Sequence, residues 1–376
     1  MKILQIHNKY LYYGGEDSVV KEEATLLKEK GHQVTQLFRD NKKEIISLND
    51  KLKALVNIAY SKNSINLINQ SLETIEKPDI AHIHNVFPLW TYSILEALSK
   101  KNIPVVMTLH NYRLVWDKLA LFDKKIFLYG AYKNSMVKTF FISRIFNKNR
   151  KLLRYIDKFI ALTEFTKKEY IKAELPSDKI IIKPNFLSKK KIEKPKINKK
   201  KGAIFASRIS KEKGIITLLK AWSTIDLDIK VLGDGPLLNK LKLKNKKVKF
   251  FGDVSREAVR KEIGNSKFLI FPSEWYECMP MTILEAFKEE TLVLASNIGS
   301  IKSIIKDKHN GILFTPGDPN DLNIKVRWIL NNPEECKSIV SNAYNDFIEN
   351  YTEENNYKKL IEVYQDAINS KNSRQF

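Results

Sequence analysis

Short apolar runs alternate with longer segments of helical periodicity along the whole chain. Strand-like runs that are each followed by an amphipathic helical stretch are typical of α/β proteins with parallel sheets. In the first half the expected strands cover residues 3–7, 33–38, 80–84, 105–109, 159–162 and 180–183. In the second half they cover residues 203–207, 228–232, 248–251, 268–271, 292–295 and 311–314. The pattern predicts two doubly wound parallel-sheet domains, with a ligand cleft at the carboxyl edges of their strands.

A lysine-rich segment separates the two halves of the 376-residue chain, which is too long for one compact core. Residues 188–201 read SKKKIEKPKINKKK, and their self-repulsion and central proline favour a solvated connector. We therefore expect an N-terminal domain at 1–187, a linker at 188–201 and a C-terminal domain at 202–354. A C-terminal helix at about 355–376 is expected to pack back on the N-terminal domain.

The charge balance is strongly basic, with 65 Lys and Arg against 43 Asp and Glu and a net charge of +22. Such an excess favours nucleic acid, an anionic bilayer or phosphorylated substrates as partners. A lysine-rich genome composition produces the same excess without any function. A nucleic-acid-binding protein should carry aromatic-studded basic motifs such as an RRM signature, and the sequence has none. We therefore expect no nucleic-acid partner.

The sequence also bears on compartment and redox state. No run approaches the roughly 20 apolar residues that span a bilayer, and the start MKILQIHNKY reads as a strand rather than a signal region. Cys278 and Cys336 give neither a disulfide scaffold nor a metal-ligand spacing. We expect a cytoplasmic protein that meets a membrane only at its surface.

Arg208 and Lys213 lie in the loop SRISKEKGI, between an expected strand and an expected helix. Such a loop directs backbone N–H groups and the positive helix end toward a ligand. Two side-chain cations there would form a clamp for a diphosphate. A solvated basic loop would have the same composition, but the position at the end of the domain's first strand favours the clamp.

Glu277 and Glu285 flank the start of an expected helix in the segment ECMPMTILE. Pro280 suits a first helical turn, so the helix should begin between residues 279 and 282. Carboxylates so placed can accept hydrogen bonds from vicinal sugar hydroxyls, although Glu285 can equally serve only the helix N-terminus. Cys278 has no evident His or Asn partner, so we expect a packing role rather than a nucleophile.

Gly14 and Gly15 stand between the first expected strand and a helix. Glycines there let a ligand approach the backbone closely, although a tight turn needs nothing more. The segment is not GxGxxG, and we expect no acidic residue to end the second strand in the dinucleotide-binding manner. A dehydrogenase is therefore disfavoured.

Three histidines lie at the ends of two neighbouring expected strands. His110, in TLHNYR, can donate to a substrate oxygen or position one. His82 and His84, in AHIHN, can be satisfied as structural residues. No third ligand with sensible spacing accompanies this HxH pair, so we expect no metal site.

The motifs GGED, TLHNYR, ALTEF, KPNF, SRISKEKG, VLGDGP, WYEC, LEAF and ASNIGSI follow one another in this order. In this the chain resembles, over nearly its full length, the retaining glycosyltransferases of family 4 (GT4) of the bacterial cell-surface polysaccharide type. The resemblance implies the GT-B fold, in which two Rossmann-like domains face a central cleft. It also implies transfer of a sugar from a nucleoside-diphosphate sugar, with a UDP-sugar favoured.

The resemblance implies a role for each matching residue. Arg208 and Lys213 would hold the donor diphosphate in place of a metal ion, so that no cofactor is needed beside the nucleotide-sugar co-substrate. Gly14 and Gly15 would approach the phosphates and the acceptor. His110 would lie beside the donor sugar and orient the reacting groups.

The acidic segment would bind the rest of the donor. Glu277 would contact sugar hydroxyls near the reacting carbon, and Glu285 would contact the ribose. The stretch Phe251–Val254 would help to hold the base. The backbone at the helix start would assist through Met279, Pro280 and Met281. Family members usually have glycine where this chain has Cys278. The larger cysteine side chain would narrow the donor pocket.

The acceptor site is expected in the N-terminal domain, for a glycan or lipid-linked hydroxyl in capsule, O-antigen or lipopolysaccharide biosynthesis. Residues 137–155, from Val137 to Tyr155, are basic and apolar near helical spacing. Such a helix would hold the enzyme at an anionic inner-leaflet surface, unless it is a core helix with a solvated basic face.

Two alternatives remain for the same fold, one enzymatic and one not. A nucleotide-sugar epimerase would need no acceptor and release no nucleoside diphosphate. A scaffold without catalysis would be expected to lose the charged residues, yet Arg208, Lys213, Glu277 and Glu285 are all present.

Overall fold

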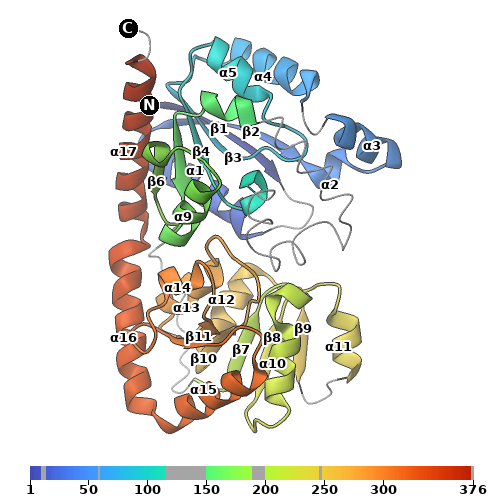
Figure 1. The fold of residues 1–376 in the computed structure, drawn as a ribbon, viewed down its shortest axis with the longest axis vertical. Helices are drawn as coiled ribbons and strands as arrows, with labels where there is room; N and C mark the ends of the chain where they lie inside the picture. Colours follow the sequence, from blue (N-terminus) through green and yellow to red (C-terminus); the bar gives the residue numbers. More distant parts are fainter. Residues whose placement is uncertain (10–13, 58–59, 116–149, 189–199, 245–247, 374–376) are drawn as a thin grey trace. The chain divides into compact units, whose positions relative to one another are not determined.

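The computed structural model describes residues 1–9, 14–57, 60–115, 150–188, 200–244 and 248–373. The chain divides into two compact units, one formed by Met1–Pro184 with Asn356–Phe376 and the other by Asn185–Asn355 (Figure 1). Each unit contains one six-stranded sheet in which neighbouring strands are parallel. The α/β class with two doubly wound parallel sheets is thereby confirmed. Residues 189–199 of the expected linker lie outside the described residues.

The sheet of the first unit has the order β2-β1-β3-β4-β5-β6. Its strands are β1 (Lys2–Lys9), β2 (Gln33–Asp40), β3 (Ile80–Asn85), β4 (Val105–Thr108), β5 (Lys158–Ala161) and β6 (Ile180–Ile182). The helices are α1 (Gly15–Glu29), α2 (Asn41–Glu44), α3 (Leu48–Asn57), α4 (Lys62–Thr74), α5 (Ile94–Lys100), α9 (Glu164–Lys172) and most of α17 (Glu353–Asn372). Short 3₁₀ turns are η1 (Tyr112–Val115), η3 (Arg150–Tyr155) and η4 (Ser177–Lys179).

Helix α17 closes one face of this sheet, although it is the last element of the chain (Figure 1). Leu360, Val363 and Tyr364 pack into one buried cluster with Ile3 of β1 and Ile80 of β3. Parallel strands are buried on both faces, so they need a cover of this kind.

The sheet of the second unit has the order β12-β11-β10-β7-β8-β9. Its strands are β7 (Ala203–Ala206), β8 (Ile229–Leu232), β9 (Lys249–Gly252), β10 (Phe268–Phe271), β11 (Leu292–Ser296) and β12 (Ile312–Phe314). The helices are α10 (Ile215–Trp222), α11 (Leu238–Lys244), α12 (Arg256–Asn265), α13 (Met281–Lys288), α14 (Ile301–Ile304), α15 (Pro319–Asn331) and α16 (Pro333–Asn350), with the 3₁₀ turn η5 (Lys211–Lys213).

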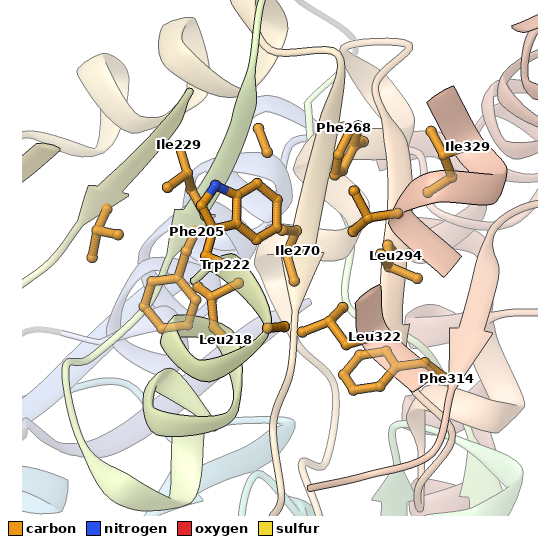
Figure 2. Close-up of a cluster of buried hydrophobic side chains, with 14 of the residues drawn as sticks. Phe205, Leu218, Trp222, Ile229, Phe268, Ile270, Leu294, Phe314, Leu322 and Ile329 are labelled. Carbon is orange, nitrogen blue, oxygen red and sulfur yellow. The ribbon is translucent and has the colours of Figure 1, made fainter. Parts of the chain in front are cut away.

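The core of the second unit lies between its sheet and two of these helices. Figure 2 shows Phe268 and Ile270 of β10 gathered with Trp222 of α10 and Leu322 of α15. Pro319 opens α15 directly after Asp318, whose carboxylate accepts from the amides of the first turn. This start combines a helix-capping acid with the position where proline is best tolerated.

Every expected strand is present, and each end lies within two residues of its expected position. One expectation about strand ends was wrong, because β2 continues to Asp40, which is acidic. Its side chain accepts from the Lys42 amide at 2.9 Å and so caps α2. Among the described residues, no helix has both the length and the apolarity that crossing a bilayer demands.

Candidate functional site

A reversal of strand order in the second unit brings two loops together. The chain runs from β7 to β8 and β9 on one side of β7 and then crosses to β10 on the other side. Open α/β sheets bind ligands at the carboxyl ends of strands where the order reverses. The loop after β7 carries Arg208 and Lys213, and the loop after β10 carries Glu277.

The basic loop is pressed against the end of β10. Gly214, which follows η5, has φ = +71°, and a Cβ there would lie 1.7 Å from the Pro272 carbonyl oxygen. Only glycine fits this position. The Glu274 amide donates to the Glu212 carbonyl at 2.9 Å, which ties the two loops together. Arg208 is exposed on the same loop.

Lys213 and Glu277 meet where these loops join. The Lys213 ammonium donates to Glu277 Oε1 at 2.5 Å, and the Ser273 hydroxyl donates to the same oxygen at 2.9 Å. The two charged side chains are 22% and 15% exposed, so solvent screens their interaction only in part. An anion bound by Lys213 would therefore lie beside the carboxylate of Glu277. This arrangement suits a ligand in which a phosphate is bonded to a hydroxyl-bearing group.

Glu285 lies inside α13, where its side chain is only 5% exposed. Its Oε1 accepts from Arg256 Nε at 3.1 Å and from Arg260 Nε at 3.3 Å. Both arginines project from α12 at the i, i+4 spacing that places side chains on one helix face. Sequence reasoning missed them, although this spacing was visible. A contact of Glu285 with ribose stays a prediction, and Val254, half-buried between β9 and α12, is likewise untested as a contact for the base.

In the first unit, Gly14 caps α1 and Gly15 is its first residue. The Gly14 amide donates to Asp17 Oδ2 at 2.9 Å, and Asp17 Oδ1 lies 2.9 Å from His7 Nε2 at the end of β1. Sequence reasoning singled out neither His7 nor the role of Asp17. The predicted approach of the glycines to phosphate stays a prediction.

His110 follows β4 and is half-buried. Its Nε2 lies 3.0 Å from Nδ1 of His84, and the two rings stack with centroids 5.3 Å apart. Burial, followed by the neighbouring His84 and His7, holds the pKa of His110 well below its ordinary value. The ring is therefore neutral near pH 7, with one nitrogen that donates and one that accepts.

His84 makes the stability of the protein depend on pH. Burial, followed by His82, lowers its pKa from 6.5 to about 3. Below pH 6.5 the unfolded state thus binds a proton that the folded state refuses, and stability falls as pH falls. We expect a loss of about 1.4 kcal/mol per pH unit below 6.5 from this residue.

Urea unfolding at pH 7.5, 6.5 and 5.5 measures this slope. The His84→Gln variant should show a shallower slope whatever its absolute stability, whereas His309→Gln, on the exposed side of the second unit, should keep the slope of the parent. An unchanged slope in His84→Gln would contradict the assignment.

The expectation that no third ligand accompanies His82 and His84 was wrong. Helix α1 brings Glu23 beside them, and one ligand atom from each residue lies within 4.8 Å of the others. His82 itself is held by Tyr364 Oη and Thr108 Oγ1, each at 2.8 Å, as a structural histidine would be.

Lys183 supplies a cation to this group. Its ammonium donates to Glu23 Oε2 at 3.1 Å, and both side chains are 1% exposed. Because the carboxylate already has a buried positive partner, a divalent cation would be repelled unless Lys183 lost its proton. The absence of a metal stays a prediction with this support.

Comparison with known proteins places these features in one family. Residues 13–190 match the family described as Glycosyltransferase Family 4, and residues 188–346 match Glycosyl transferases group 1. The chain belongs to the GT4-type glycosyltransferases. It is 26% identical to an uncharacterized glycosyltransferase of Methanocaldococcus jannaschii, over 97% of this chain and 98% of that protein.

Two further similarities concern parts of the chain or the fold alone. The alpha-1,4-N-acetyl-D-galactosaminyltransferase of Campylobacter jejuni that acts on a PP-undecaprenol-linked glycan is 29% identical over 43% of this chain and 48% of that protein. The Anabaena protein HepE in complex with UDP is 15% identical, with a TM-score of 0.70 over 97% of this chain and 100% of that chain. The GT-B fold is thereby confirmed.

The helix start of this glycosyltransferase departs from expectation at one residue. Pro280 is the N-cap of α13 and has no N–H, so it cannot donate a hydrogen bond to a ligand. Only Met279 and Met281 can supply amides there. Met279 also packs inward, where its sulfur accepts from the Asn185 amide at 3.1 Å, and Cys278 is buried, as a packing role requires.

The expected basic helix at 137–155 lies mostly outside the described residues. Its last part, Arg150–Tyr155, forms the 3₁₀ turn η3. The membrane contact of this segment stays a prediction.

Proposed function

We propose that this glycosyltransferase moves a sugar from a nucleoside-diphosphate sugar, preferably a UDP-sugar, to a hydroxyl of a glycan or lipid-linked acceptor. Transfer proceeds with retention of the anomeric configuration and without a metal ion. The observation that carries the proposal is the contact between Lys213 and Glu277 at the carboxyl ends of β7 and β10. In a nucleotide sugar the sugar is bonded to the outer phosphate, so a cation for the phosphate and an acceptor for sugar hydroxyls must be neighbours.

The chemistry follows from these charges. Negative charge develops on the diphosphate as it leaves the anomeric carbon, and preorganised cations stabilise that charge. Lys213 is held in place by Glu277, and Arg208 lies on the same loop. Arg256 and Arg260 add positive charge beside Glu285 at the same end of the sheet. Positive side chains thereby do the work that a metal ion does elsewhere.

The acceptor and the setting are inferred from the relatives and the charge. The similar Campylobacter jejuni enzyme bears the name of a lipid-linked glycan acceptor, which supports an acceptor of that class. A net charge of +22 favours the anionic cytoplasmic face of a membrane. We place the enzyme there, in biosynthesis of a capsule, an O-antigen or another cell-surface polysaccharide.

Donor binding is tested by thermal shift against UDP-, GDP- and ADP-sugars. A ligand at about 100 times its Kd adds about 2.7 kcal/mol to the stability of the unit that binds it. For a unit of this size we expect Tm to rise by roughly 5–10 °C with the preferred UDP-sugar and to stay unchanged with the others.

Transfer is tested with the donor found in that screen. Release of nucleoside diphosphate should require an acceptor, persist in excess EDTA and give a product with the anomeric configuration of the donor by NMR. Conversion of the donor sugar without an acceptor would instead establish an epimerase. Loss of transfer in EDTA that Mg²⁺ restores would overturn metal independence.

A further inference from the structure

A chain of buried polar side chains ends on His110. Gln5 of β1 is 1% exposed and His84 of β3 is 2% exposed, so water does not reach their hydrogen bonds. Four of the six histidines of the protein, His7, His82, His84 and His110, lie at or near the carboxyl ends of β1, β3 and β4. This is where the strand order of the first unit reverses, between β1 and β3. The half-buried ring of His110 is therefore available to a ligand that binds at this edge of the sheet.

The direction of the first hydrogen bond in the chain is fixed by the backbone. Gln5 Nε2 donates to the Val20 carbonyl at 3.1 Å, and Gln5 Oε1 accepts from Gln36 Nε2 at 2.7 Å. A carbonyl oxygen can only accept, so the amide of Gln5 cannot be turned round. Its second N–H is the one that faces His84 Nε2 at 3.2 Å.

The direction of this hydrogen bond determines the tautomers of His84 and His110. His84 Nε2 accepts from Gln5, so the single hydrogen of this neutral ring lies on Nδ1. Nδ1 of His84 then donates to His110 Nε2 at 3.0 Å. With Nε2 of His110 accepting, its hydrogen lies on Nδ1, which has no hydrogen-bond partner in the described part of the chain.

Glu23 favours the other tautomer of His84, with hydrogen on Nε2. Glu23 Oε1 lies 3.3 Å from the same nitrogen of His84 and therefore competes with Gln5 for it. Burial alone would raise the pKa of Glu23, but the Lys183 ammonium, followed by His82, holds that pKa well below its ordinary value. The carboxylate is therefore charged and would accept a hydrogen from His84 if Gln5 did not occupy its Nε2.

We propose that Gln5 and His84 are positioning residues that fix His110 in the tautomer with hydrogen on Nδ1. This nitrogen donates a hydrogen bond to an oxygen of a substrate bound at this edge of the sheet, a role that rests on the function proposed above. A histidine held in one tautomer by a partner behind it is pre-organised, so no reorientation is needed when the substrate binds.

The tautomer is read directly in the unaltered protein. In ¹⁵N-histidine-labelled protein, long-range ¹H–¹⁵N spectra separate Nδ1–H from Nε2–H rings, and His110→Gln identifies the signals of His110. We expect His110 to be neutral with hydrogen on Nδ1 throughout pH 6–8. A ring with hydrogen on Nε2, or an equal mixture, would overturn the proposal without any variant.

Two variants with opposite expectations sharpen the test. Gln5→Met keeps the side-chain volume but removes the hydrogen-bond donor. The hydrogen of His84 should then move to Nε2 and be donated to Glu23, and the hydrogen of His110 should move from Nδ1 to Nε2. We expect kcat/KM for sugar transfer to fall about 10–100-fold, the range for loss of a group that orients a functional histidine. The double variant Glu23→Gln with Lys183→Met removes the competing acceptor and its cation together, and should keep both the tautomer and the kcat/KM of the parent.

A metal ion is the competing explanation for the same residues. An ion bound by Glu23, His82 and His84 would take His84 Nε2 away from Gln5. One equivalent of a transition metal in the purified protein, measured by mass spectrometry and lost in His84→Gln, would therefore overturn the proposal.

The proposed function and this inference fail in different ways. If the tautomer is as expected but the protein transfers no sugar, the function is wrong and so is the role of His110 toward the substrate. If sugar is transferred and the ring carries its hydrogen on Nε2, only the positioning role is wrong.

Discussion

Replacing Lys213 by alanine should lower kcat for sugar transfer by ~10²–10³-fold, the usual cost of removing one preorganised donor to developing charge. The ammonium lies 2.5 Å from Glu277 and is 22% exposed, so solvent screens its charge only in part. The negative charge on the leaving diphosphate would lose this partner in the transition state. Initial rates at saturating donor and acceptor measure the effect.

The matched control is Lys220→Ala, which removes the same charge from an exposed position on α10. It should leave kcat and the thermal shift by UDP unchanged, whereas Lys213→Ala should lose most of that shift. Turnover of a confirmed donor by Lys213→Ala near the rate of the parent would contradict the role of Lys213 in binding the diphosphate.

Replacing Lys183 by methionine should lower the free energy of unfolding by about 3–5 kcal/mol, because it leaves a buried carboxylate without its counter-charge. Lys183 and Glu23 are each 1% exposed and 3.1 Å apart. The pKa of Glu23 in the folded protein is lowered. The pair therefore contributes fully above the unfolded-state pKa of the carboxyl, and its contribution is lost as pH falls through the folded-state pKa. Urea unfolding at pH 7.5 tests the prediction.

The double variant Glu23→Gln with Lys183→Met should regain most of the lost stability, since no lone charge stays buried. A comparison pair is Glu169→Gln with Lys172→Met, which removes a more exposed i, i+3 pair from α9 of the same unit and should change little. Equal stability of Lys183→Met and the parent would show that the buried ion pair is not what holds Glu23.

The fold was largely readable from the chain because its sheets are parallel. Parallel strands are covered on both faces, so they appear as apolar runs, and every expected strand is present. The end of β2 was misjudged because Asp40 continues the strand while its side chain caps the next helix. A polar residue at a strand end can be the last residue of the strand and the cap of the next helix at once.

The donor-side residues were predictable only by position. Lys213 and Glu277 each follow a strand, and the carboxyl ends of neighbouring parallel strands meet, so both were expected at one edge. Their ion pair depends on β10 lying next to β7, which no local pattern states. The partners of Glu285 were missed for the same reason, since α12 and α13 meet only in the folded unit.

The position of Glu23 in the sequence already indicated a buried acid with a partner. It stands three residues after Val20 and four before Leu27, on the apolar face of α1, where an acid must find a partner. The pattern does not say that this partner is Lys183, 160 residues later in the chain.

The sequence by itself determined the alternation of strands and helices, the positions of the basic loop and the acidic segment, and the family that they indicate. These are properties of backbone periodicity and burial, which neighbouring residues carry. Only the tertiary structure decided that Lys213 contacts Glu277, that Glu285 lies between two arginines and that Gln5 and His84 stand behind His110. Pairings among buried polar groups depend on strand order and on packing between distant segments, because each group takes whichever partner the fold brings within about 3 Å.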